Sequence, residues 1–523
     1  MSNTEKTILS DVNIFRRHPS PQDVTELRGV IESNEDSLAS LKEEIEACSR
    51  QLSALRTKSY AHVLAIRRCK AAMTPARLLP SEILAKIFRH ASEMGWTRSP
   101  IVASHVCSTW RAAAHFHPSV WSRITVNLDT RDPICWTKHW LTMARQASLH
   151  VAIVHTVPTA ILGQVMALLL EHSEQWASLT LDLHFADTRQ VLAMCNNRFT
   201  RLGSIRVSLF VSEGLDALAE QEGATGFVHA FQDAPRLDSI TILGNIMPRD
   251  LPPRLTSLRI EYDDPSGHSI ESPSSIIEAL RNLPDLETLT LQLGVMYPVS
   301  LSPAGIPFIE LPKLKSITYE DLRTGGFQVL RHLAAPSLVQ LYAYIRPDTE
   351  DYEPPIYLVA LLENSPLVET LELEGVDIWR TEWLSIFPRL PKLQKLHLHD
   401  SEIDDTVIER MFGESGLCPD LRRIDLRWCQ HVSGTTLVQL VESRMKNGGC
   451  GIEEVAAIGC SLFTKQDALQ LASLTTFRVV TEERDDRCRE RKCCDNKQYR
   501  QRLKFHLLTL PKEERAGIRL AVD

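Results

Sequence analysis

The sequence predicts an α/β protein with an N-terminal helix, a small all-α module and a curved solenoid that carries a parallel β-sheet on its concave face. Three patterns lead to this fold class. A heptad pattern of apolar residues comes first, two short apolar helices follow, and a strand-like template then repeats along the rest of the chain. With 523 residues, 43% of them hydrophobic, the chain can bury a large core.

Charge and cysteine usage limit the class of partner. The chain has 58 Lys and Arg against 66 Asp and Glu, a net charge of -8, which argues against nucleic acid as the main partner. Its 12 cysteines are scattered in apolar contexts, and the N-terminus lacks the apolar core of a signal peptide. We expect a reducing intracellular compartment, cytoplasm or nucleus. The most apolar run, residues 161–170, is too short to cross a bilayer, so no membrane partner is expected.

Residues 24–72 predict a helix of the coiled-coil type. Its seam positions alternate in steps of four and three: Leu27, Ile31, Asn34, Leu38, Leu41, Ile45, Cys48, Leu52 and Leu55. A polar Asn34 on the seam would fix the register of a coiled coil. Self-association through this helix is one interpretation, and a single helix folded back on the body is the other. Residues 1–23 before it are predicted to be disordered.

Two short helices are predicted between residues 76 and 122. Pro80 suits the first turn of a helix, and the apolar residues Ile83, Leu84, Ile87 and Phe88 follow at helical spacing. Ser99 and Pro100 mark a second start, followed by an apolar stripe through Ile101, Val102, Val106 and Trp110. Two such helices cannot bury both apolar faces against each other, so some of these side chains should remain available to a partner.

These residues also carry a resemblance. The string Leu79-Pro80-x-Glu82-Ile83-Leu84-x-x-Ile87-Phe88, then Val106-Cys107-x-x-Trp110-Arg111 and Pro118-x-Val120-Trp121, resembles an F-box. In that family the motif docks on the Skp adaptor of cullin-RING ubiquitin ligases. The resemblance implies adaptor contacts at Leu79, Pro80, Ile83, Leu84, Ile87, Phe88, Val106, Cys107 and Trp110. Residues 93–98 depart from the family pattern. A helical hairpin that is only core is the alternative.

From residue 123 to residue 480 the chain repeats one template, apolar-x-x-apolar-x-apolar. The first apolar positions of the clearest copies are Leu286, Leu314, Leu338, Val368, Leu393 and Leu421, which are 24 to 30 residues apart. Weaker copies begin at Trp176, Leu202, Leu237, Leu255 and Ile452. Helical stretches lie between the copies, so each unit is predicted to be strand, turn and helix, and only stacking on neighbours buries its apolar faces.

Side chains alternate along a strand, so the residues between the inward leucines should point to the open, concave face. This rule nominates Tyr342, Tyr344, Glu372, Glu374, Lys395, His397, His399, Arg423, Asp425 and Arg427 as a substrate-binding surface. A solvated strand face without a partner is the alternative. His397 and His399 could share a metal ion with Asp400 or Asp425, but no Cys or His pair completes such a site, so we expect no metal and no cofactor.

The order of modules resembles that of F-box proteins with C-terminal leucine-rich repeats of the fungal type. This resemblance implies a substrate-recognition adaptor of an SCF-type (Skp-cullin-F-box) ubiquitin ligase, with a protein substrate on the concave face. No phosphate loop, HExxH or GxSxG motif occurs, so we expect no enzyme. A non-ligase scaffold built from the same repeats is the alternative. Residues 481–523 are predicted to form a charged tail.

Overall fold

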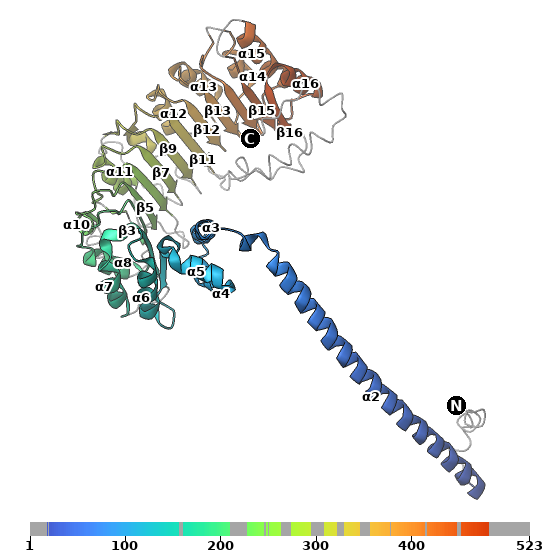
Figure 1. The fold of residues 1–523 in the computed structure, drawn as a ribbon. Helices are drawn as coiled ribbons and strands as arrows, with labels where there is room; N and C mark the ends of the chain where they lie inside the picture. Colours follow the sequence, from blue (N-terminus) through green and yellow to red (C-terminus); the bar gives the residue numbers. More distant parts are fainter. Residues whose placement is uncertain are drawn as a thin grey trace. The chain divides into compact units, whose positions relative to one another are not determined.

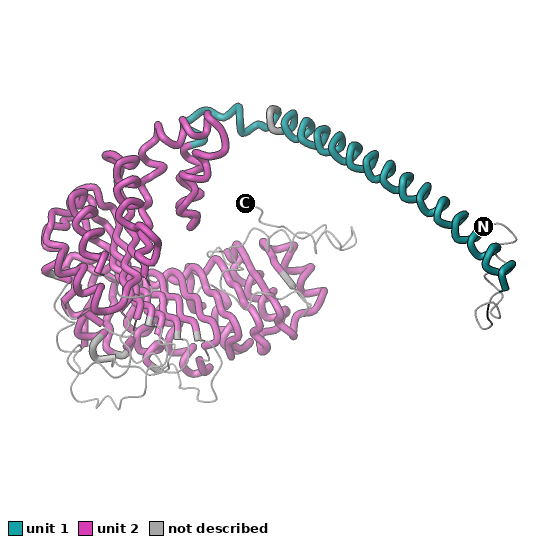
Figure 2. Tube along the Cα trace, turned by 90° about the horizontal axis from the view of Figure 1, so that it is seen from below, with its two compact units in different colours: residues 1–84 teal, residues 85–523 magenta. Residues whose placement is uncertain are grey.

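The computed structural model divides the chain into two compact units, residues 1–84 and residues 85–523 (Figure 2). It describes residue 18 and residues 20–155, 160–209, 227–244, 247–248, 250–262, 273–293, 308–321, 329–345, 356–376, 378–413, 416–446 and 451–480. Most of the predicted disordered segment 1–23 and the whole charged tail 481–523 lie outside these residues. Within the described ranges, no helix is both long and apolar enough to span a bilayer.

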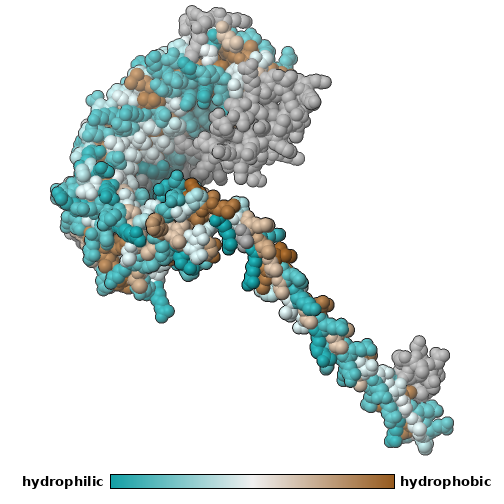
Figure 3. Space-filling view, in the orientation of Figure 1, coloured by the Kyte–Doolittle hydropathy of each residue, from teal (hydrophilic) through white to brown (hydrophobic). Residues whose placement is uncertain are grey.

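The first unit is dominated by α2 (Pro21–Ala72), one unbroken helix of 52 residues (Figure 1). Its start follows from a reciprocal cap. The Ser20 N–H donates to Asp23 Oδ2 at 2.8 Å, the Asp23 N–H donates to Ser20 Oγ at 3.3 Å, and Pro21 occupies the first turn. No further proline interrupts the helix. Brown, apolar side chains are spaced along its teal and white surface in Figure 3.

Three short helices form the predicted all-α module: α3 (Ser81–Glu93), α4 (Ser99–Val106) and α5 (Ser108–Phe116), followed by the 3-10 turn η2 (Pro118–Trp121). The prediction of one continuous stripe from Ile101 to Trp110 was wrong, because the chain breaks at Cys107. The backbone there is extended, with φ -159°, and the Cys107 side chain accepts the Trp110 N–H as the N-cap of α5. One expected helix is therefore two.

The predicted α/β solenoid with a parallel sheet is confirmed (Figure 1). In the described part of the chain, fourteen strands form one sheet in sequence order. They are β1 (Arg123–Asn127), β2 (Leu149–Val154), β3 (Trp176–Asp182), β4 (Ser204–Leu209), β5 (Ser239–Gly244), β6 (Ser257–Tyr262), β7 (Thr288–Leu293), β9 (Ser316–Asp321), β11 (Gln340–Ile345), β12 (Thr370–Glu374), β13 (Lys395–His399), β14 (Arg423–Arg427), β15 (Glu454–Ile458) and β16 (Thr476–Val480). Two further short strands, β8 (Ile309–Glu310) and β10 (Leu333–Ala334), pair with each other.

Helices lie on the outer side of this sheet and leave its inner face open (Figure 1). They are α6 (Pro133–Ala144), α7 (Leu162–Leu170), α8 (Phe185–Met194), α10 (Phe227–Ala230), α11 (Pro273–Arg281), α12 (Ile356–Glu363), α13 (Arg380–Ile386), α14 (Asp405–Glu409), α15 (Gly434–Lys446) and α16 (Lys465–Leu474). The apolar template residues explain this arrangement. Leu341, Leu371 and Leu396 lie directly beside one another in register and are at most 1% exposed, so each strand buries its core-facing side chains between the sheet and the helices.

A cluster of tryptophans joins the helical module to the first repeat. The Trp121 and Trp140 rings meet edge to face at 4.9 Å, and Trp136 stacks on Trp140 at 4.5 Å. Trp121 Nε1 donates to the Ala114 carbonyl of α5 at 2.8 Å, and Trp140 Nε1 donates to the Arg123 carbonyl of β1 at 2.9 Å. The indoles thus fill the junction and satisfy backbone carbonyls on both sides of it.

Two cysteines fill successive turns after strands. Cys429 Sγ contacts the Leu398 carbonyl and Cys460 Sγ the Leu426 carbonyl, each at 3.7 Å. Burial raises the pKa of Cys460 to about 11 and also raises that of Cys429. Both thiols therefore stay protonated at neutral pH and act as packing groups.

A buried arginine in α15 holds the segment before β14. Arg444 is 2% exposed. Its guanidinium donates to the carbonyl oxygens of Met411 at 2.9 Å, Leu417 at 2.8 Å, Cys418 at 3.1 Å and Pro419 at 2.8 Å.

We predict that Arg444→Met lowers the free energy of unfolding by about 3 kcal/mol, because several buried carbonyls lose their donor. Urea unfolding followed by circular dichroism measures this change. Arg410→Met, which removes the same charge from an exposed position, should shift the free energy by less than about 0.5 kcal/mol. Equal midpoints for the two variants would contradict the role of Arg444.

Candidate functional site

Helix α3 carries two apolar stripes with opposite fates. Leu84 and Phe88, one turn apart, are 1% and 3% exposed and belong to the core of the module. Ile83 and Ile87, also one turn apart, are 39% and 47% exposed. The helix is started by the Pro80 carbonyl, which accepts the N–H groups of Ile83 and Leu84 at 3.1 Å. One helix therefore anchors the module and also presents an apolar surface.

The end of α3 and the start of α4 are joined by two buried serines. Ser92 Oγ and Ser99 Oγ lie 2.6 Å apart and share a hydrogen bond, and both lie within hydrogen-bond distance of the Phe88 carbonyl, at 3.2 and 2.9 Å. Between them, the segment that departs from the F-box pattern turns at Gly95, whose φ is +93°. Met94 and Trp96 are 77% and 56% exposed there. The departure is therefore an exposed turn between two fixed helix ends.

The remaining module residues nominated from sequence differ in exposure. Val106 is 56% exposed at the end of α4, whereas Trp110 is half-buried and its ring lies 5.1 Å from that of Phe88. Cys107 is half-buried as the cap of α5, Leu79 is half-buried, and Pro80 is exposed. Phe116, which was not nominated from the sequence, is 77% exposed at the end of α5.

The concave face of the solenoid has a polar hollow of about 520 Å³ over β11 to β16. Parallel pairing in register produces it, because one position of each strand lies beside the same position of the next. Seven of the nominated residues line it: Tyr342, Glu372, Lys395, His397, Arg423, Asp425 and Arg427. Tyr344, Glu374 and His399 are one row away and do not line it.

Salt bridges order the floor of this hollow. Arg427 grips Asp425 with two hydrogen bonds of 2.9 and 2.7 Å and is only 5% exposed. His397 lies between Glu372 and Asp425, with a ring nitrogen 3.9 Å from each carboxylate. In the next row His399 is 7% exposed, and its Nδ1 lies 3.1 Å from Glu374 Oε1. Arg427 and His399 are therefore internal partners more than open surface.

Two lining residues that the sequence analysis did not nominate complete the charge pattern. Arg478 of β16 pairs with Glu454 of β15 at 2.7 Å, and Arg423 approaches the same carboxylate at 3.8 Å. Lys395, at the exposed edge of the hollow, forms no salt bridge with any described residue. Counting Arg427, the lining holds four permanent cations against the three carboxylates of Glu372, Asp425 and Glu454. The hollow thus has a small excess of positive charge.

The electrostatics of Asp425 follow from this surrounding. Burial alone would raise the pKa of its carboxyl, but the charges of His397, Arg427 and Arg478 and the hydrogen bond from Arg427 outweigh burial and lower the pKa. The carboxylate is therefore ionised at neutral pH. Among the described residues, no group of three or more His, Cys, Asp or Glu side chains could hold a metal ion.

Comparison with known proteins identifies one segment. Residues 76–127 match the F-box-like family model. This segment is an F-box-like domain. The match covers α3, α4, α5, η2 and β1, so the apolar stripe of Ile83 and Ile87 lies within the F-box-like domain.

A crystal structure of a Bacteroides fragilis protein superposes on 60% of this chain and 76% of its own, with 11% sequence identity and a TM-score of 0.32. That superposition is too loose to support an inference. No curated protein matches the chain. Beyond the F-box-like domain, the assignment of a solenoid rests on the parallel sheet and the register of its strands.

We predict that Asp425→Asn destabilises the protein by about 2 kcal/mol at pH 7, because the nearly buried Arg427 loses its charged partner. The native pKa of Asp425 is lower than its ordinary value of 3.8, so the unfolded state binds the proton more readily. The Asp425–Arg427 ion pair therefore stabilises the folded state fully at pH values above 3.8. Its contribution is lost as the pH falls below 3.8 and through the native pKa of Asp425.

Urea unfolding at several pH values measures this difference, which should shrink in acid. Asp420→Asn, which removes the exposed carboxylate that pairs with Lys392, is the control. It should lower the free energy of unfolding by less than about 1 kcal/mol at every pH. A difference for Asp425→Asn that stays constant down to pH 3 would contradict the assignment.

Proposed function

We propose that this chain is a non-catalytic substrate-recognition adaptor of an SCF-type ubiquitin ligase. The F-box-like domain would dock the Skp adaptor and through it the cullin core, the concave face would bind a protein substrate, and partners would carry out ubiquitin transfer. This is the arrangement of fungal-type F-box proteins with leucine-rich repeats, acting in the cytoplasm or nucleus. The observation that carries the proposal is the exposed apolar stripe of Ile83 and Ile87 inside a matched F-box-like domain.

The domain's own packing suggests how the adaptor would be bound. Leu84 and Phe88 are buried in the core of the domain, and Trp110 packs on Phe88. These residues would support the docking surface from below and contact the adaptor little. Leu79, Pro80, Ile83, Ile87 and Val106 keep exposed area that an adaptor could cover. Exposed aliphatic groups of this kind favour burial against another protein by about 25 cal/mol per Å² of apolar surface.

The concave hollow suggests the chemistry of the substrate. Most charged side chains on the floor of the hollow already pair with one another. They would therefore present a substrate with a fixed arrangement of charges more than with groups free to bind it. Lys395 and Arg423 are exposed at its edge, and Tyr342 lines one side. We propose that the substrate presents an acidic segment to Lys395 and Arg423, which would give orientation and association rate.

We predict that Ile83→Asp with Ile87→Asp reduces affinity for purified Skp adaptor by about 100-fold or more, because two apolar contacts become charged. Isothermal titration with the full-length chain measures the affinity. Phe308→Asp with Leu462→Asp, two exposed apolar residues of the solenoid, is the matched control and should bind as wild type does. If folded wild-type protein does not bind the adaptor, the scaffold function replaces the ligase function.

We predict that peptides selected on the wild-type chain from a displayed random library are enriched in Asp and Glu. Lys395→Glu with Arg423→Glu should weaken their binding at least about tenfold, through loss of attraction and added repulsion. Lys392→Glu with Arg422→Glu makes the same charge change at exposed positions outside the hollow and should leave binding unchanged. Neutral peptides that bind all variants equally would exclude this surface.

A further inference from the structure

We infer that α2 is one strand of a parallel, two-stranded coiled coil formed with a second copy of this chain. The seam is long. The 52-residue helix continues the heptad beyond Leu55, through Ser59 and His62 to Ile66 and Cys69. At 1.5 Å per residue the helix is about 78 Å long, enough for more than six heptads.

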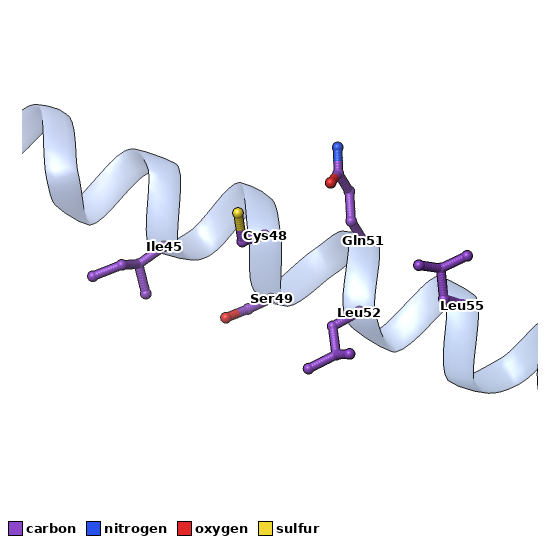
Figure 4. A pocket seen from close by; sticks show the side chains of 6 residues that line it. All are labelled: Ile45, Cys48, Ser49, Gln51, Leu52 and Leu55. Atoms are coloured by element: carbon purple, nitrogen blue, oxygen red, sulfur yellow. The ribbon is translucent and has the colours of Figure 1, made fainter.

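The seam is uncovered in the single chain. Ile31, Leu38, Leu41, Ile45, Leu52, Leu55 and Ile66 are each 50 to 64% exposed. Figure 4 shows Ile45 and Leu52 on one side of the helix and Cys48 and Leu55 on the other, flanked by Ser49 and Gln51. These six residues line a hollow of about 470 Å³ along the helix. In a parallel coiled coil each hole for a knob of the facing helix has three seam residues and one flanking residue. The lining supplies two such sets, Ile45, Cys48, Ser49 and Leu52, and Cys48, Gln51, Leu52 and Leu55.

The residue types at the seam favour two parallel strands. With Leu38 as position a and Leu41 as position d, four of the seven a positions are β-branched, and three of the seven d positions are leucine. The β-branched a residues are Val24, Ile31, Ile45 and Ile66, and the leucines at d are Leu27, Leu41 and Leu55. β-Branched residues at a with leucine at d favour parallel dimers over higher oligomers. Asn34 occupies a d position, where a polar residue restricts the register.

The charges beside the seam favour the same orientation. The charged e positions are Arg28, Glu35, Lys42, Arg56 and Lys70, and the charged g positions are Asp23, Glu44 and Lys58. In a parallel dimer each g position faces the e position five residues later in the partner helix, and no such pair carries like charges. Antiparallel helices would bring e positions together, and four of the five charged ones are cationic. A second copy in parallel is therefore the occupant that the surface fits.

The assembly would present two F-box-like domains and two solenoids. The dimer depends only on α2, so it stands whether or not the chain serves a ubiquitin ligase. If the proposed function also holds, one assembly could hold two sites of one substrate, and the effective concentration of the second site would strengthen binding without new contacts.

Light scattering on the full-length chain tests the dimer. We expect a mass of twice 59.1 kDa at micromolar concentration. Leu38→Asp with Ile45→Asp, both at a positions, should raise the dissociation constant by about 100-fold or more. Ala39→Asp with Ala47→Asp adds the same charges at b and c positions on the outer face and should remain dimeric. Circular dichroism confirms that the solenoid is folded in each variant.

Two exposed cysteines of the seam test the orientation. Cys48 and Cys69 both occupy d positions, so a parallel register places each beside its own copy. A short bis-maleimide should join Cys48 to Cys48 and Cys69 to Cys69, as identified by peptide mass spectrometry, and Cys48→Ser with Cys69→Ser should abolish both links. A monomeric wild type, a trimeric mass, a dimer that survives the a-position variant or a Cys48–Cys69 link would each overturn the inference.

Discussion

The structure depends on the inability of a single repeat to bury its own apolar side chains. A strand such as β12 buries Leu371 and Leu373 only because β11 and β13 carry apolar residues at the same register. Stacking in register is therefore the condition for a core. The same condition aligns the outward residues into rows, so the charged hollow over β11 to β16 arises from the packing that stabilises the fold.

The F-box-like domain solves a related problem with very few residues. Three short helices cannot enclose a large core. The domain therefore also packs against the solenoid through Trp121, whose ring contacts Trp140 of the first repeat. Helix α3 then divides its apolar residues between folding and exposure. Because the two stripes are separate, the exposed one can change without loss of the core. Under the proposed function, docking and stability would thus depend on different side chains of one helix.

The sequence predicted the regular parts well, because periodicity reports burial directly. The template copies at Trp176 and Leu255 were weak but correspond to β3 and β6. Strand β16 lies within the predicted solenoid but was not among the predicted template copies, although Leu474, Phe477 and Val479 obey the template. With β16 missed, Arg478 and its pairing with Glu454 were missed too.

For the concave face, the sequence predicted which side chains point away from the core better than it predicted which of them are exposed to solvent. Alternation along a strand tells which side chains leave the core, but not which of them pair with a neighbour. The burial of Arg427 against Asp425 depends on that local geometry and could not be deduced from spacing. The break at Cys107 was likewise invisible, since a thiol is an uncommon helix cap.

The rows on the concave face also set a spacing for whatever crosses them. Neighbouring strands lie about 4.8 Å apart, so each row offers one side chain at that interval. In an extended chain laid across the strands, residues on the same side are about 6.8 Å apart, so after a few residues they no longer align with successive strands. A helix presents one residue per turn at about 5.4 Å, much closer to the interval of the strands. If the proposed function holds, rows such as Thr370, Lys395 and Arg423 would match a helical segment of the substrate along the solenoid more closely than an extended one.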